Sequence, residues 1–155
     1  MIAENKWKER LIAHEGLRLK PYRDNRGFLT IGVGRCLDKN PFSADELQLV
    51  GNWRQGISQA AAMQLLQNDV ERLLKNLASR LDFWPRLDDE RQYALLDMAF
   101  QMGLGGLLKF CKMLAAIRQQ NWDEASRQCL DSDYGRRYRK RAHEIAALLK
   151  CGAQK

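Results

Sequence analysis

Residues 14–34 of the chain read HEGLRLKPYRDNRGFLTIGVG and hold its densest cluster of unusual residues. Within them, residues 29–33 alternate apolar with small or polar side chains, a period of two that is typical of a β-strand. Residues 24–27, DNRG, come just before and have the composition of a turn. The stretch therefore predicts a small β-hairpin or meander.

Helical patterns lie on both sides of this hairpin. Before it, residues 4–14 predict a short helix that Gly16 stops. After it, residues 38–56 show weak periodicity and predict a loop with at most one short helix. Ser58 is then a good N-cap for a helix whose apolar spacing continues for about five turns.

The carboxyl-terminal half predicts four further helices after a break at Trp84-Pro85. The first begins at Asp89, with Gln92 three residues later, and ends at the glycines of residues 103–106. The others cover residues 107–119, start at the capping box of residues 121–124, and cover approximately residues 136–149. The expected architecture is a small β-containing piece in front of a larger helical bundle.

The composition is that of one folded domain. The 155 residues include 45% hydrophobic and 29% charged residues but only 3 prolines, which excludes fibrous and disordered classes. Lys and Arg outnumber Asp and Glu by 26 to 19, and the resulting charge of +7 is spread over both halves of the chain. Such a diffuse positive charge favours polyanionic partners, whether nucleic acid, anionic lipid or an acidic wall polymer.

No segment approaches the roughly 20 apolar residues of a membrane span, and the amino end lacks the apolar core of a signal peptide. We therefore expect synthesis in the cytoplasm and no export without help. The four cysteines lie far apart without a Cys-x-x-Cys pair, and the two histidines have no partner at ligand spacing. We expect reduced thiols, no metal site and no cofactor.

Two carboxylates stand out in the opening stretch. Glu15 falls at the end of the first predicted helix and Asp24 in the turn of the adjoining hairpin, so both can point into one cleft. The partial negative charge of a helix carboxyl end disfavours an ionised Glu15, whereas Asp24 in a polar turn is expected to stay ionised. Such a pair can perform general acid and base chemistry when the environments of the two carboxyls differ.

The same residues resemble the catalytic region of the tailed-phage lysozymes, the endolysins of glycoside hydrolase family 24. Glu15, Asp24 and Thr30 are separated by eight and then five residues, as in that family. The similarity continues at residues 68–69, 100–103, 122–125 and 141–142, so that it covers nearly the whole chain.

The resemblance implies an α+β, mostly helical fold in a single lysozyme domain over residues 1–155. Residues 14–60 would form a β-containing amino-terminal lobe and residues 58–80 a connecting helix. Residues 1–13 would join residues 81–155 in a helical carboxyl-terminal lobe. The implied reaction is hydrolysis of the β-1,4 bond between N-acetylmuramic acid and N-acetylglucosamine in peptidoglycan.

The resemblance also assigns roles to individual residues. Glu15 would be the general acid, Asp24 would assist the attack on the sugar, and Thr30 would help to hold the nucleophilic water, with inversion as the expected outcome. The cation of Arg141 would lie beside the catalytic glutamate. Six further positions correspond to substrate-contacting positions of the family: Cys36, Phe100, Gln101, Met113, Gln128 and Tyr134.

Several positions depart from the family pattern. Cys36 stands where a leucine is common, Gln128 where an asparagine often contacts substrate, and Tyr134 where a tryptophan often lies. Arg35 replaces a histidine that is often paired with an aspartate of the long helix. Asp69 lies beside the apolar stripe of that helix, where an unpaired carboxylate would be costly, so we predict an Arg35–Asp69 salt bridge.

Alternative functions arise from the basic run of residues 136–141, which holds five cations in six residues. The run fits a solvated helix face, a nucleic-acid-binding protein or an amphipathic helix that disrupts membranes. The resemblance favours peptidoglycan glycan strands as the partner over nucleic acid, and leaves peripheral contact with the anionic envelope open. It further implies a monomer that lyses its host and that, after synthesis in the host cytoplasm, needs a holin to reach the wall in the periplasm.

Overall fold

A short helix leads into an antiparallel sheet near the start of the protein. The computed structural model describes residues 4–153 and places helix α1 over Glu4–Glu15. The sheet that follows has the strand order β1-β2-β3. Its strands are β1 (Arg18–Arg23), β2 (Leu29–Gly32) and β3 (Arg35–Cys36). The predicted hairpin is thus a three-stranded meander.

The polypeptide divides into two compact units, one ending at Glu71 and one beginning at Arg72. The boundary falls inside the long helix α3 (Gln59–Arg80), so this helix contributes to both units. The α+β, mostly helical fold is confirmed. Helix α1 is grouped with the sheet in the first unit. Its association with the carboxyl-terminal lobe, like the predicted lobe boundaries, stays a prediction.

The register of the sheet decides which side chains share a face. Thr30 pairs with Tyr22 on one neighbouring strand and with Cys36 on the other, so these three side chains lie on one face. Ile31 pairs with Arg35, and both belong to the opposite face. The core of the first unit includes Ile31 and five further buried residues: Val50, Ile57, Ala61, Ala62 and Leu65.

Two helices complete the first unit. Helix α2 (Ala44–Val50) begins with a capping box, because the Ser43 hydroxyl accepts from the Glu46 amide at 3.2 Å and the Glu46 carboxylate accepts from the Ser43 amide at 3.0 Å. One turn of 3-10 helix, η1 (Trp53–Gln55), follows it. Helix α3 begins where the sequence predicts, since the Ser58 hydroxyl accepts from a first-turn amide at 3.0 Å.

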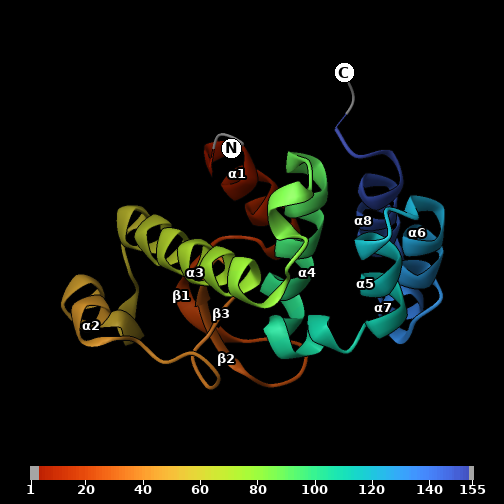
Figure 1. The fold of residues 1–155 in the computed structure, drawn as a ribbon. Coiled ribbons are helices and arrows are strands. Elements are labelled where there is room, and N and C mark those ends of the chain that lie inside the picture. The colour runs from red at the N-terminus through yellow and green to blue at the C-terminus, as the bar shows by residue number, and fades with distance from the viewer. Residues whose placement is uncertain (1–3, 154–155) are drawn as a thin grey trace. The chain divides into compact units, whose positions relative to one another are not determined.

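The second unit is built from helices. Helix α8 packs against α4, α6 and α7, and α5 packs against α6 (Figure 1). The elements after α3 are η2 (Trp84–Arg86), α4 (Asp89–Leu108), α5 (Cys111–Arg118), α6 (Trp122–Leu130), α7 (Asp133–Arg137) and α8 (Arg139–Cys151). Among residues 4–153 no single helix is long and apolar enough to cross a membrane, and α4 with α5 would reach that length and composition only together, across a bend of 98°.

Helix α4 begins at Asp89, as the sequence predicts, but its cap and its carboxyl-terminal end differ from the prediction. Asp88 rather than Asp89 caps the helix, because the Asp88 carboxylate accepts hydrogen bonds from two first-turn amides. Gly103 alone interrupts it, with φ 79° and ψ 161°, and the two later glycines stay in its last turn. Helix α5 therefore begins at Cys111 and not at residue 107. The predicted cap of α6 at Asn121 is confirmed.

The predicted last helix is divided in two. Tyr138, at φ −118° and ψ 55°, separates α7 from α8. Helix α7 starts earlier than predicted because the Ser132 hydroxyl accepts from the Gly135 amide at 3.0 Å and so caps a new helix. The basic run of residues 136–141 is therefore split between two helices and forms no continuous helix face.

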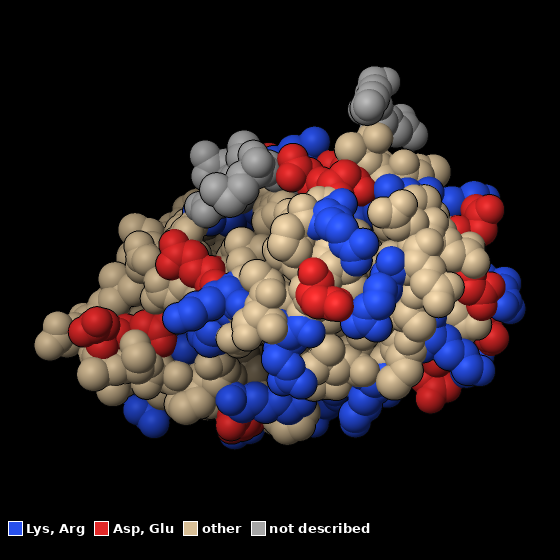
Figure 2. Space-filling view, in the orientation of Figure 1, with Lys and Arg blue, Asp and Glu red and all other residues tan. Residues whose placement is uncertain are grey.

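Charged side chains are dispersed over the surface. Figure 2 shows Lys and Arg over much of the visible face, with Asp and Glu among them. Several exposed cations form salt bridges with nearby carboxylates, such as Arg127 with Glu124 at 2.6 Å and Arg118 with Asp82 at 3.0 Å. The arrangement agrees with the diffuse charge that the sequence predicts.

Gly135→Ala should destabilise the protein. A Cβ at this position of α7 would press into the backbone carbonyl of Leu130, which has no flexible end to move aside. We expect a loss on the order of 1 to 3 kcal/mol in the free energy of unfolding, measured by urea denaturation. The matched control is Gly105→Ala in α4, where a Cβ meets nothing within 4 Å and helix propensity should add about 0.5 to 1 kcal/mol. Equal behaviour of the two variants would contradict the packing of α7 against α6.

Candidate active site

Glu15 is the last residue of α1, and the backbone after it ends the helix. Gly16 adopts φ +80°, a conformation that favours glycine, and its amide donates to the Ile12 carbonyl at 2.7 Å. The side chain of Glu15 is half-buried, and its Oε2 atom is inaccessible to solvent. The predicted stop signal thus places a carboxylate at the end of a helix, next to the sheet.

Gly34 makes the space that the Glu15 carboxylate occupies. A Cβ at Gly34 would lie 2.6 Å from Glu15 Oε1 and 3.2 Å from its Cδ. Gly34 also has φ +63°, so both its backbone angle and its lack of a side chain are required. The carboxylate therefore lies against the backbone that joins β2 to β3.

Asp24 is fixed by the turn between β1 and β2. Its Oδ1 atom accepts hydrogen bonds from the amides of Arg26 and Phe28, both at 2.9 Å. The hydrogen bond from the Phe28 amide, followed by that from Arg26 and the Arg26 charge, lowers the pKa of Asp24 below its usual value. The carboxylate is consequently ionised at neutral pH, and its occupied oxygen holds the orientation of the group.

Thr30 lies on β2 and is 3% exposed. Its hydroxyl donates to the Phe28 carbonyl at 2.9 Å, so the oxygen is left to act as an acceptor. Phe28 therefore holds both residues, because its amide binds the Asp24 carboxylate and its carbonyl binds the Thr30 hydroxyl. This role of the Phe28 backbone was not predicted, since a backbone contact leaves no residue-type signal in the sequence.

The phenol of Tyr22 is affected by the charges of both carboxylates. Burial is the main cause that raises the pKa of its phenol, and the negative charges of Glu15 and Asp24 both raise it further, while the Arg18 cation opposes them. Tyr22 also pairs with Thr30 across the sheet. Glu15 at the helix end and Asp24 in the turn thus both act electrostatically on a tyrosine that pairs with Thr30 across the sheet.

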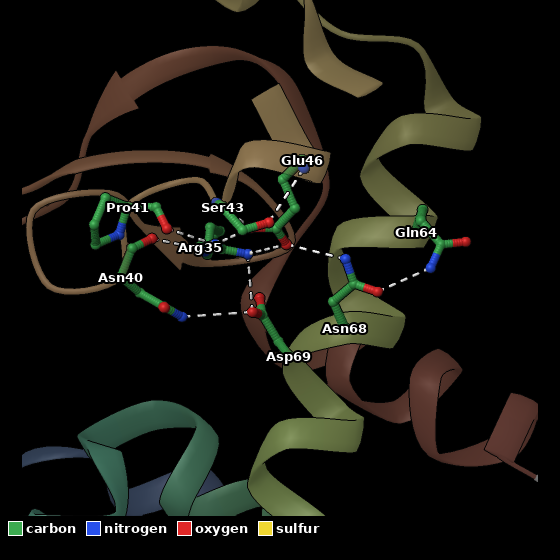
Figure 3. A network of polar contacts seen from close by, with 8 residues as sticks. All are labelled: Arg35, Asn40, Pro41, Ser43, Glu46, Gln64, Asn68 and Asp69. Carbon is green, nitrogen blue, oxygen red and sulfur yellow. Dashed lines mark hydrogen bonds and ion pairs between the residues drawn. The ribbon is translucent and has the colours of Figure 1, made fainter. Parts of the chain in front are cut away.

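Arg35 lies on the other face of the sheet at the centre of a buried polar network (Figure 3). It is 3% exposed, and its Nη1 atom contacts Asp69 Oδ1 at 2.9 Å. The predicted Arg35–Asp69 salt bridge is confirmed. Its Nη2 atom donates to Glu46 Oε1 at 2.7 Å and to the Pro41 carbonyl at 3.1 Å, and Nε donates to the Asn40 carbonyl at 2.7 Å.

Glu46 is a member of this network that was not predicted. Hydrogen bonds from Arg35, and further ones from the Ser43 amide and the Asn68 side chain, lower the pKa of Glu46 to about 2 against the cost of burial. The signal in the sequence was the Ser43-x-x-Glu46 capping box, which marks the start of α2. The same carboxylate therefore caps a helix and neutralises a buried cation.

A second buried ion pair lies in the carboxyl-terminal unit. Arg141 Nε donates to Asp97 Oδ1 at 2.8 Å, and the Tyr93 hydroxyl donates to Asp97 Oδ2 at 2.7 Å. Asp97 is completely buried in α4 and was not predicted. A signal was present, because Asp97 interrupts an apolar run four residues after a tyrosine.

The remaining predicted substrate positions differ in accessibility. Phe100, Gln101 and Gln128 are partly buried, and the Gln128 amide donates to Glu124 at 2.8 Å. Tyr134 is 7% exposed with its ring edge against Phe110, and Met113 is 1% exposed and belongs to the core. Cys36 is partly exposed on the face of Thr30. Substrate contact at these positions stays a prediction.

The predicted residues fall into two sets. The first unit contains Glu15, Asp24, Thr30, Arg35, Cys36 and Asp69, and the second contains Phe100, Gln101, Met113, Gln128, Tyr134 and Arg141. Within residues 4–153 no three His, Cys, Asp or Glu side chains are grouped so that they could hold a metal ion. The chemistry that the first set offers is that of a carboxyl group, a second and ionised carboxylate, and a hydroxyl oxygen that can accept a hydrogen bond.

Comparison with known proteins gives a consistent result. The phage lysozyme family matches residues 12–148. The chain is 33% identical to the pre-baseplate central spike protein Gp5 of Enterobacteria phage T4, over 93% of this chain but only 27% of that protein. It is 26% and 24% identical to the probable T4-type lysozymes 2 and 1 of Dictyostelium discoideum, over 96% and 94% of this chain and 95% and 94% of those proteins.

Asp69→Asn should lower the free energy of unfolding by on the order of 1 to 4 kcal/mol, because it leaves part of the buried Arg35 charge uncompensated. The matched control is Asp82→Asn, which breaks an exposed pair with Arg118 and should leave stability close to that of the wild type. Urea denaturation of Asp69→Asn, of an Arg35 variant and of the variant with both substitutions measures the coupling between Arg35 and Asp69. Absence of coupling between Arg35 and Asp69 would contradict the network.

The network should also give acid-dependent stability. The pKa of Glu46 falls from 4.5 to about 2 on folding, so its contribution is complete above pH 4.5 and is lost as the pH falls toward 2. The loss should reach up to about 3 kcal/mol. Urea denaturation between pH 2 and 7 should show this slope in the wild type and a shallower one in Glu46→Gln. An unchanged slope would assign the acid sensitivity to other carboxylates.

Proposed function

The chain belongs to the phage lysozyme family, and on that premise we propose that it is a muramidase that hydrolyses the β-1,4 bond between N-acetylmuramic acid and N-acetylglucosamine in bacterial peptidoglycan. The observation that carries the proposal is the family match over residues 12–148, together with a half-buried Glu15 held against Gly34 and an ionised Asp24 fixed in the turn after β1. Two carboxyl groups in different environments are what most glycosidases require.

Glu15 is the proposed general acid, which donates its proton to the oxygen of the leaving sugar. Gly34 keeps the Glu15 carboxyl close to the sheet, and the cap at Gly16 fixes the helix end that carries it. Because the side chain is half-buried, water has limited access to its carboxyl group. These features support transfer of the proton to a bound sugar.

Asp24 and Thr30 are proposed to act on the sugar ring and on the water that attacks it. The ionised Asp24 stabilises the positive charge that develops on the sugar ring and assists the attack. The Thr30 oxygen, whose proton is donated to Phe28, accepts a hydrogen bond from the attacking water. We expect inversion at the anomeric carbon, which needs room for that water between sugar and carboxylate.

The biological role is proposed to be lysis of a host cell. Similarity to relatives named probable T4-type lysozymes, over nearly their whole length, supports the role of a lysozyme. Similarity to part of a baseplate spike protein supports a wall-degrading module as the alternative setting. In the first role we expect a monomer that is made in the host cytoplasm and reaches the wall in the periplasm after holin permeabilisation. The net charge of +7 favours its approach to an anionic wall.

Glu15→Gln should reduce lysis by at least tenfold, since an amide keeps the shape of the side chain but has no proton to donate, and general acid catalysis contributes about 10² to 10⁴ in rate. Asp24→Asn should also be severely impaired. The measurements are the clearing of permeabilised Gram-negative cells and the release of new reducing ends from purified peptidoglycan.

The control for both variants is Glu9→Gln, which changes an exposed carboxylate on the same helix as Glu15. It should retain wild-type activity. Circular dichroism should be the same for all three variants, so that loss of the fold is not mistaken for loss of catalysis. Retention of more than about a tenth of the activity by Glu15→Gln would remove Glu15 from the role of general acid.

A further inference from the structure

We infer that Arg35 is a positioning residue for catalysis: from the buried face of the sheet it fixes the backbone that shapes the sites of Glu15 and Thr30. The inference rests on the proposed muramidase function. It assigns Arg35 a role in the rate of the reaction in addition to its role in stability.

The position of Arg35 in the chain carries the first step. It follows Gly34, where a Cβ would lie only 2.6 Å from Glu15 Oε1. It precedes Cys36, which pairs with Thr30 across the sheet. Of three consecutive residues, Gly34 therefore lies against the proposed acid, Arg35 belongs to the buried network, and Cys36 pairs with Thr30, whose hydroxyl is proposed to bind the water. A displacement of this backbone therefore moves the site of the proposed acid, Glu15, and that of the water-binding residue, Thr30, at the same time.

The shortness of β3 explains why its backbone needs an anchor. The strand has only two residues, so few ladder hydrogen bonds hold it. The Arg35 side chain supplies the missing restraint, because all three guanidinium nitrogens donate to fixed acceptors (Figure 3). Two of these acceptors are the backbone carbonyls of Asn40 and Pro41, and the others are the carboxylates of Glu46 on α2 and Asp69 on α3.

The chemistry of the network requires arginine. A guanidinium reaches four acceptor groups in fixed directions, whereas the single nitrogen of a lysine would leave some of them without a donor. The side chains of Arg35, Glu46 and Asp69 are only 2%, 6% and 5% exposed, so water cannot replace a lost donor cheaply. Arg35→Lys thus keeps the charge while it loosens the anchor.

Arg35 does not act by direct contact with substrate. It is 3% exposed, its nitrogens are occupied, and its pairing with Ile31 puts it on the face opposite Thr30. Its effect must reach the reaction through the positions of Gly34 and Cys36. A misplacement of reacting groups by about 1 Å can cost a factor of about 100 in rate, so a small shift is sufficient.

The experiment compares Arg35→Lys with Ser58→Ala, which removes the cap of α3 in the same unit without touching the network. Both are assayed on purified peptidoglycan at a temperature where circular dichroism shows them fully folded. We expect kcat of Arg35→Lys to fall by about 10- to 100-fold with KM within about threefold of the wild type. Ser58→Ala should lower Tm but leave kcat unchanged.

A spectroscopic readout separates positioning from stability. The ¹³C resonance of the Glu15 carboxyl should shift in Arg35→Lys and not in Ser58→Ala. If Arg35→Lys does not fold, Asp69→Asn takes its place, because it keeps the guanidinium and its other acceptors and should lower kcat in the same direction.

Three outcomes would overturn the inference. One is an unchanged kcat with a lowered Tm, which would make Arg35 a stabilising residue only. Another is a raised KM at constant kcat, which would indicate substrate binding. The third is an unchanged Glu15 resonance. Inactivity of the wild type on peptidoglycan would instead overturn the proposed function, and the inference with it.

Discussion

The buried guanidinium of Arg35 is the interaction on which the amino-terminal unit depends. It joins the two-residue strand β3 to helices α2 and α3 through ion pairs with Glu46 and Asp69. Burying one cation with two carboxylates has a large desolvation cost, which is offset only when every donor meets an acceptor. Loss of one partner therefore disturbs the whole arrangement. The arginine also keeps its charge at any physiological pH, whereas a histidine at this position would titrate near neutrality.

Backbone groups position the candidate catalytic residues. Glu15 is positioned by the cap at Gly16 and by the space at Gly34, while Asp24 and Thr30 are both bound by the backbone of Phe28. Amides and carbonyls are fixed dipoles that need no reorganisation when charge develops on a substrate. Side-chain identity thus matters most at the three reactive groups, and backbone angle matters most at the glycines beside them.

Each unit contains a buried ion pair between arginine and carboxylate, but a different partner is the more deeply buried one in each. In the carboxyl-terminal unit the completely buried Asp97 binds Arg141 with one oxygen and the Tyr93 hydroxyl with the other. In the amino-terminal unit the arginine is the more deeply buried partner and the carboxylates surround it. In both, a charge inside the protein is held by groups from different segments of the chain. The pairs consequently link segments in a way that apolar packing, which has no preferred direction, does not.

The sequence by itself determined the elements whose signals are local. Alternating residues predicted the strands, Ser58 and Asn121 marked helix starts, Gly16 marked a helix end, and the spacing of Glu15, Asp24 and Thr30 indicated the family. The Arg35–Asp69 pair was also predicted, because a carboxylate beside an apolar stripe needs a partner and the family resemblance put Arg35 at the position of that partner. Tertiary structure decided the rest. Glu46 and Asp97 acquire their roles from residues far away in the chain. The break at Tyr138 has no Gly or Pro at that position to mark it in the sequence. The position of the Glu15 carboxyl depends on the absence of a Cβ at Gly34. Local propensity acts between neighbours in sequence, whereas the burial of charge and the fit of one side chain against a distant backbone exist only after the chain has folded.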